Sequence, residues 1–239
     1  MRHVGVDGCR AGWVAITRGH EKLEYAVFGT IRDVLAAYDD AERIFVDVPI
    51  GLPWDGAPIR PCDRLARGLL GKPRMSSVFP VPCREAVYAR SLAEARKVNS
   101  AVLRRSLTEQ TWGICAKIKQ VDALLLENAP LGVQVREIHP ELCFWALAGR
   151  KPMRHRKSTV AGRNERLDVI SRHEPGASAL LRLALSQTRR TDVQADDVLD
   201  AMVAFITAEA QAGRLTCLTG EPSRDQRGLP IEMLYAEPD

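Results

Sequence analysis

The chain has six cysteines but lacks any C-x-x-C pair. Structural zinc sites usually have cysteines or histidines at such paired spacings, so this absence argues against one. Disulfides are rare in a reducing compartment, where we expect the chain to reside. We therefore expect most of the cysteines to be small buried hydrophobic side chains.

Long apolar runs are also missing. None approaches the roughly 20 residues needed to span a membrane, and the N-terminal residues carry no apolar signal region. These absences predict a cytoplasmic protein with no membrane partner. Hydrophobic residues nevertheless make up 46% of the sequence, enough to build a sizeable core.

Charge is unevenly distributed, although the net charge is only +4. Residues 149–166 hold seven Lys or Arg and one acid, whereas residues 192–239 hold ten acids and three arginines. A basic strip beside an acidic region is typical of a metal-dependent site that binds phosphate. A solvated basic loop is the alternative interpretation.

The N-terminal pattern predicts three short strands joined by tight turns, then a helix capped by Thr30 and a buried fourth strand. The strands are expected at residues 2–7, 13–17, 23–28 and 43–48, and the helix at 30–38. The fourth strand is expected to lie parallel to the first. This order is the opening of an RNase H-like sheet.

The remainder predicts one further strand and several helices around a proline-rich stretch at residues 49–82. The strand is expected at 133–138, and the helices at 63–70, 84–98, 107–127, 141–148, 164–173 and 193–212. A capping box opening at Ser106 marks the start of the third of these helices. We predict an α/β fold with an RNase H-like mixed five-stranded sheet flanked by helices. The prediction is a single domain, 1–239, with a proline-rich and helical insertion at 49–130 and a basic helical insertion at 149–190.

Five acidic residues stand where they have few purely structural uses. Asp7 and Asp47 end neighbouring strands, and ligands bind at that edge of open α/β sheets. Asp197 and Asp200 project from nearly one face of a helix, and Glu137 ends the fifth strand. Carboxylates this close repel one another, and a bound cation relieves the repulsion. Mg²⁺ and Mn²⁺ prefer such oxygen ligands.

Four of the acids also have a plainer interpretation, whereas Asp200, a turn further into its helix, is harder to explain by the helix dipole. Asp7 and Asp47 can shape turns, and Asp197 can be a helix-terminal acid favoured by the helix dipole. Glu137 can pair with its neighbour Arg136. His139, two residues after Glu137, can relay a proton, contact phosphate or serve structure alone.

Four long motifs resemble the family known as domain of unknown function 429, described as predicted RNase H-like nucleases. The motifs are VGVDGCRAGW (4–13), FVDVPIGLP (45–53), REIHPE (136–141) and DDVLDA (196–201). SSVFP (76–80), Gly162-Arg163 and GLPIE (228–232) extend the resemblance over nearly the whole chain. It implies that Asp7 binds two metals, Asp47 supports one, and Asp197 and Asp200 complete the shell. Glu137 has no firm counterpart in the general pattern.

These features together predict a nuclease that hydrolyses DNA or RNA with two Mg²⁺ or Mn²⁺ ions. Its predicted catalytic residues are the five acids, four of which (all but Glu137) are metal ligands. Its predicted substrate-binding residues are Arg10, Lys117, His139, Arg150, Lys151, Arg154, Arg156, Lys157 and Arg163.

Two alternatives stay open: a metal-stabilised scaffold without catalysis, and an actin-like phosphotransferase that grips phosphate with residues 7–12. The second would need a duplicated domain, and the sequence has no internal repeat. The oligomeric state is also open, with a homodimer as one alternative.

Overall fold

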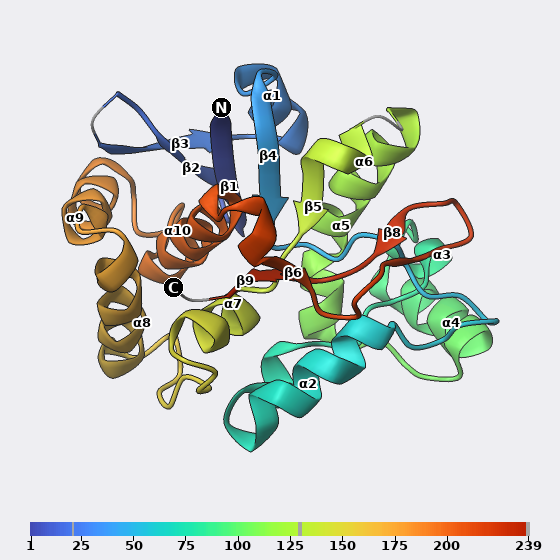
Figure 1. Ribbon diagram of the computed structural model, residues 1–239. Helices are drawn as coiled ribbons and strands as arrows, with labels where there is room; N and C mark the ends of the chain where they lie inside the picture. Colours follow the sequence, from blue (N-terminus) through green and yellow to red (C-terminus); the bar gives the residue numbers. More distant parts are fainter. Residues whose placement is uncertain (21, 129–130, 238–239) are drawn as a thin grey trace.

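A five-stranded mixed sheet forms the centre of the protein (Figure 1). The computed structural model describes residues 1–20, 22–128 and 131–237. The strands are β1 (Arg2–Cys9), β2 (Gly12–Arg18), β3 (Leu23–Phe28), β4 (Ala41–Val46) and β5 (Val135–Glu137), in the order β3-β2-β1-β4-β5. β1, β2 and β3 form an antiparallel meander, and β1, β4 and β5 are parallel. The predicted meander and the return of the fourth strand beside the first are confirmed.

Alternation along the strands divides the core into two layers, one on each face of the sheet. Val4 and Val6 of β1 face a layer that includes α1 (Ile31–Ala37) and α5 (Glu109–Glu127). Phe45 of β4 faces the other layer, which includes α7 (Pro140–Leu147) and α10 (Ala195–Glu209). The sheet is therefore flanked by helices on both faces, as predicted.

Thr30 caps α1 as predicted, and it does so in a capping box, its hydroxyl accepting from the Asp33 amide. Several of the other helices have boundaries that differ from prediction. The helix expected at 84–98 divides into α3 (Arg84–Val87) and α4 (Leu92–Leu103), because Ser91 caps a new start by accepting from the Glu94 amide. Thr108, rather than Ser106, caps α5 and accepts from the Thr111 amide.

The segment predicted as the first insertion holds α2 (Pro61–Arg74), η1 (Met75–Ser77), α3, α4 and α5. Residues 129 and 130 of that segment lie outside the described residues, as do 21, 238 and 239 of the predicted domain. The basic segment holds α8 (Val160–His173) and α9 (Ala177–Gln187); the sequence pattern did not predict α9. The fifth strand is shorter than predicted because α6 (Leu131–Gln134) precedes it.

The C-terminal region was not predicted to contain strands. After η2 (Ala212–Arg214), β6 (Leu215–Cys217) pairs with β9 (Leu234–Ala236), and β7 (Ser223–Arg224) pairs with β8 (Pro230–Ile231). Runs of two or three residues are too short to show alternation. No helix in the described part of the chain is long and apolar enough to cross a membrane.

Candidate active site

Three predicted acids meet where the sheet and α10 come together. Asp7 lies in β1, Asp47 follows β4, and Asp200 lies in the second turn of α10. Val6 and Val46 are register partners in the parallel pair, and the Asp47 amide donates to the Val6 carbonyl at 3.1 Å. Asp7 and Asp47 are therefore side by side at the carboxyl edge of the sheet, on the face that α10 covers.

The acids are held in an environment that penalises negative charge. Asp7 is 6% exposed and Asp200 is 2% exposed. Burial, followed by repulsion from Asp47 and Asp200, raises the pKa of Asp7 well above its ordinary value. Burial and repulsion from Asp200 raise the pKa of Asp47 to about 7.

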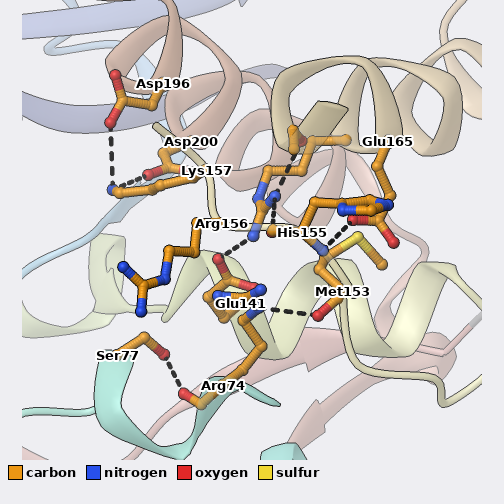
Figure 2. A network of polar contacts seen from close by, with 12 residues as sticks. Arg74, Ser77, Glu141, Met153, His155, Arg156, Lys157, Glu165, Asp196 and Asp200 are labelled. Carbon is orange, nitrogen blue, oxygen red and sulfur yellow. Dashed lines mark hydrogen bonds and ion pairs between the residues drawn. The ribbon is translucent and has the colours of Figure 1, made fainter. Parts of the chain in front are cut away.

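A lysine ammonium offsets part of this charge. Lys157 Nζ lies 2.7 Å from Asp200 Oδ2 and 3.9 Å from Asp196 Oδ2 (Figure 2). Attraction to Asp200, then to Asp7 and Asp47, raises the pKa of Lys157 well above its ordinary value. Among the described residues, no three His, Cys, Asp or Glu side chains are arranged as ready metal ligands. The cation among these carboxylates is the ammonium of Lys157.

The loop that carries Lys157 is anchored on both sides. Glu165 of α8 accepts from the Arg154 and His155 amides at 2.8 and 2.9 Å. From α2, the Arg74 guanidinium donates to the carbonyls of Met153 and Arg154 at 2.8 and 2.9 Å (Figure 2). These contacts explain why part of the basic strip lies against the acids.

Asp197 has a capping role. Its Oδ2 accepts from the Gln194 amide at 2.8 Å at the start of α10. Burial raises the pKa of Asp197 to about 6. This placement agrees with the helix-terminal interpretation, and a role in metal binding stays a prediction.

Glu137 is engaged in a buried ion pair. It is 2% exposed, and it accepts from the Arg60 guanidinium and, at 2.6 Å, from the Ile50 amide. The neighbouring Arg136 pairs with Glu232 instead, so the expected Arg136–Glu137 pair is not formed. Glu137 holds the chain after β4 in place, and a catalytic role stays a prediction.

Glu137→Gln is expected to lower the free energy of unfolding by about 2 kcal/mol, because Arg60 loses a charged partner inside the protein. Urea unfolding of the variant and the wild type measures the loss. Glu85→Gln serves as the control, since Glu85 is exposed. Unchanged stability together with lost activity would favour a catalytic Glu137.

A cavity of about 570 Å³ opens beside the acids. Of the predicted residues, Asp47, His139, Arg156, Lys157 and Asp200 line it. The prediction missed the other eleven lining residues, among them Lys72, Arg74, Ser76, Ser77 and Glu141. Two of the motifs that carry the family resemblance, SSVFP and REIHPE, contain Ser76, Ser77 and Glu141, and that was the available signal.

Two polar atoms of this cavity's lining residues are buried and have no hydrogen-bond partner in the part of the chain that the structure describes. Glu141, 6% exposed, pairs through one oxygen with Arg166, whereas its Oε2 has no partner. His139 Nε2 lies 3.4 Å from the Ser77 carbonyl oxygen, and its Nδ1 has no partner. Burial lowers the pKa of His139, so the imidazole is neutral near pH 7. Buried polar atoms are normally satisfied, so these two are available to hydrogen-bond or coordinate a group in the cavity.

The other predicted binding residues lie outside the lining of this cavity. Lys117 donates to the Gly12 carbonyl and lies 4.6 Å from the centre of the Trp13 ring. Arg150 pairs with Glu237 at 2.7 Å. Arg10, Lys151 and Arg154 are exposed, and Arg163 lines a second cavity.

Asp47→Asn is expected to stabilise the protein at pH 7 in EDTA and to change nothing near pH 4. The folded pKa of Asp47 is about 7, above its ordinary value of 3.8. The contribution of the Asp47 carboxyl to the free energy of unfolding is therefore fully present below about pH 4, and it is lost as the pH rises toward 7. Urea unfolding across this range measures the difference between the two proteins. A constant difference would contradict the account.

Comparison with known proteins identifies a family. The model for the family described as "Protein of unknown function (DUF429)" matches residues 5–224. No curated protein and no solved structure shows a significant match to the chain. Because the matched residues cover most of its length, the chain belongs to the DUF429 family.

Proposed function

We propose that this protein is a divalent-metal-dependent nuclease with an RNase H-like arrangement. The observation that carries the proposal is a cation, the Lys157 ammonium, held among buried carboxylates at the carboxyl edge of parallel strands. The strand order β3-β2-β1-β4-β5, with β4 and β5 parallel to β1, supports the arrangement. Sites of open α/β sheets lie at this edge.

The donor set suits Mg²⁺ or Mn²⁺. Asp7, Asp47 and Asp200 supply hard oxygen ligands, and their mutual repulsion favours a cation of higher charge than an ammonium. The unpartnered Oε2 of Glu141 supplies a further oxygen beside Asp47. We propose that these four residues hold the metal once Lys157 moves aside. When bound, two such ions activate water and stabilise the leaving oxygen of a phosphodiester.

The surrounding side chains support a phosphate substrate. Arg156 and Lys72 line the cavity and have no acidic partner among the described residues, so their charges are available to phosphate oxygens. The tautomer of His139 that donates from Nε2 to the Ser77 carbonyl leaves Nδ1 able to accept a proton from water.

A cleavage assay tests the proposal. Purified protein is incubated with labelled DNA and RNA, single-stranded and duplex, in Mg²⁺, Mn²⁺ or EDTA. We expect metal-dependent hydrolysis of at least one polymer, lost in EDTA and in Asp200→Asn. Hydrolysis that persists in EDTA contradicts the metal role. Metal binding without hydrolysis of any polymer would instead favour the non-catalytic scaffold.

A further inference from the structure

A second cavity with basic residues lies near the cavity beside the acids. A second cavity of about 350 Å³ is lined by Arg163 and Arg190, with the first turn of α10 at one side. Ser158 lines both cavities, so the two spaces adjoin across the start of the basic segment's helix. A ligand long enough to pass Ser158 would therefore contact residues of both cavities.

Both cavities have cationic side chains in their lining. Lys72 and Arg156 belong to the first cavity, and Arg163 and Arg190 to the second. None of the four has an acidic partner in the part of the chain that the structure describes. Figure 2 shows the Arg156 side chain extending away from Lys157 and Asp200, toward the side of the cavity where Ser77 and Arg74 lie. Unpaired cations spaced along a groove are the pattern expected for a polyanion.

The first cavity also has an apolar wall. Phe79, Ile114 and Pro73 line it, and Phe79 is half-buried, packed partly against the core and partly open to the cavity. An aromatic ring within reach of phosphate-binding groups is a platform on which a nucleobase stacks. The cavity therefore offers surfaces for both parts of a nucleotide unit.

Burial of the acids restricts the shape of the polymer. Asp200 lines the cavity and is only 2% exposed, so a phosphate must enter the cavity to reach it; Asp7, which does not line the cavity, is 6% exposed. The phosphates of a rigid duplex lie on a wide cylinder whose bases are paired and stacked inside. A single strand is narrow, and its bases are free to stack on protein rings.

Resting on the proposed nuclease function, we propose that the substrate is a single strand of nucleic acid. One base stacks on Phe79, the scissile phosphate lies at the acids beside Arg156, and the strand passes Ser158. The next phosphates then contact Arg163 and Arg190. The second cavity is thus a binding site for the continuing strand, and Phe79 and Arg190 are binding residues that the sequence pattern did not single out.

Fluorescence anisotropy with labelled oligonucleotides in EDTA tests this route without cleavage. A strand of about 12 nucleotides is compared with a trinucleotide and with a duplex of the same sequence. We expect the long strand to bind more tightly than the duplex. Arg163→Ala/Arg190→Ala should weaken long-strand binding at least about tenfold and lower its salt slope by roughly 1.4, or 0.7 per lost phosphate contact. The trinucleotide should bind both proteins equally.

Three further variants sharpen the measurement. Arg190 is exposed and has no partner among the described residues, so Arg190→Ala alone should keep the fold and show about half the change in slope. Phe79→Leu should weaken binding of the strand and the trinucleotide alike, by about tenfold. Arg90→Ala/Lys97→Ala removes two exposed charges at α3 and α4, across the molecule from α8 and α9 (Figure 1), and should change nothing.

Equal losses in the two double variants, or tighter binding of the duplex, would overturn the inference. The outcomes separate it from the proposed function. If the wild type cleaves nucleic acid but the salt dependence of binding is unchanged in Arg163→Ala/Arg190→Ala, the proposed path of the strand is wrong and the nuclease function stands. If strand binding depends on these two arginines but no metal-dependent cleavage is found, the nuclease function is wrong and the path of the strand stands.

Discussion

Asp7→Asn is expected to abolish cleavage while leaving the protein folded and at least as stable as the wild type. Asn keeps the oxygen that accepts from the Gly8 amide at 2.8 Å, so the turn after Asp7 is retained. The variant also removes a buried charge that Asp47 and Asp200 repel. The proposed metal site loses a central ligand, so its affinity for the metal falls. Because metal ions contribute several kcal/mol to such reactions and each 1.4 kcal/mol is about tenfold, activity should fall at least about a hundredfold.

The experiment measures cleavage rate and thermal midpoint on the same preparations. Asp39→Asn is the matched control, since Asp39 is exposed and has no partner among the described residues. Its activity and midpoint should equal those of the wild type. An Asp7→Asn protein with full activity would remove Asp7 from the site, and one that fails to fold would give Asp7 a structural role instead.

Gly5→Ala is expected to cost at least about 3 kcal/mol of folding free energy, the upper end of the range for overpacking. A methyl group at Gly5 would overlap the backbone nitrogen of Phe205 and the carbonyl oxygen of Ala201. Both atoms belong to α10, so the helix must move away from β1. Asp200 moves with it, and we expect the residual folded protein to lose activity as well.

Urea unfolding with far-ultraviolet circular dichroism measures this cost. Gly68→Ala is the control, because nothing lies within 4 Å of a methyl group at that position of α2. Alanine in place of a helical glycine should stabilise by about 0.5–1 kcal/mol. A Gly5→Ala protein as stable as the wild type would contradict the close packing of α10 on β1.

The sequence was sufficient to predict that Asp7, Asp47 and Asp200 come together. The two strands that carry Asp7 and Asp47 are strongly apolar, and a parallel return places their ends at one edge. The pattern of α10 is equally clear, since Asp200 is the acid within an otherwise apolar stretch, Val198 to Phe205. Long elements with strong periodicity were therefore predicted with their neighbours.

Contacts that depend on loops could not be predicted in this way. Lys157 reaches Asp200 across 43 residues of sequence, and Arg60 reaches Glu137 across 77. Both basic residues come from segments without strand or helix periodicity, so no pattern says where they point. Glu141 belongs to the REIHPE motif, but the sequence could not predict that its Oε2 would lack a partner among the described residues, because this depends on how the surrounding side chains pack.

The most direct test is a calorimetric titration of the protein with Mn²⁺, using wild type, Asp7→Asn, Asp200→Asn and Asp39→Asn. The titration is repeated with a saturating single strand, because some metal sites load only with substrate. We predict saturable binding in the wild type and in Asp39→Asn, and its loss in the two site variants. Absence of saturable binding in the wild type under both conditions, or equal affinity in all four proteins, would contradict a metal site among these acids.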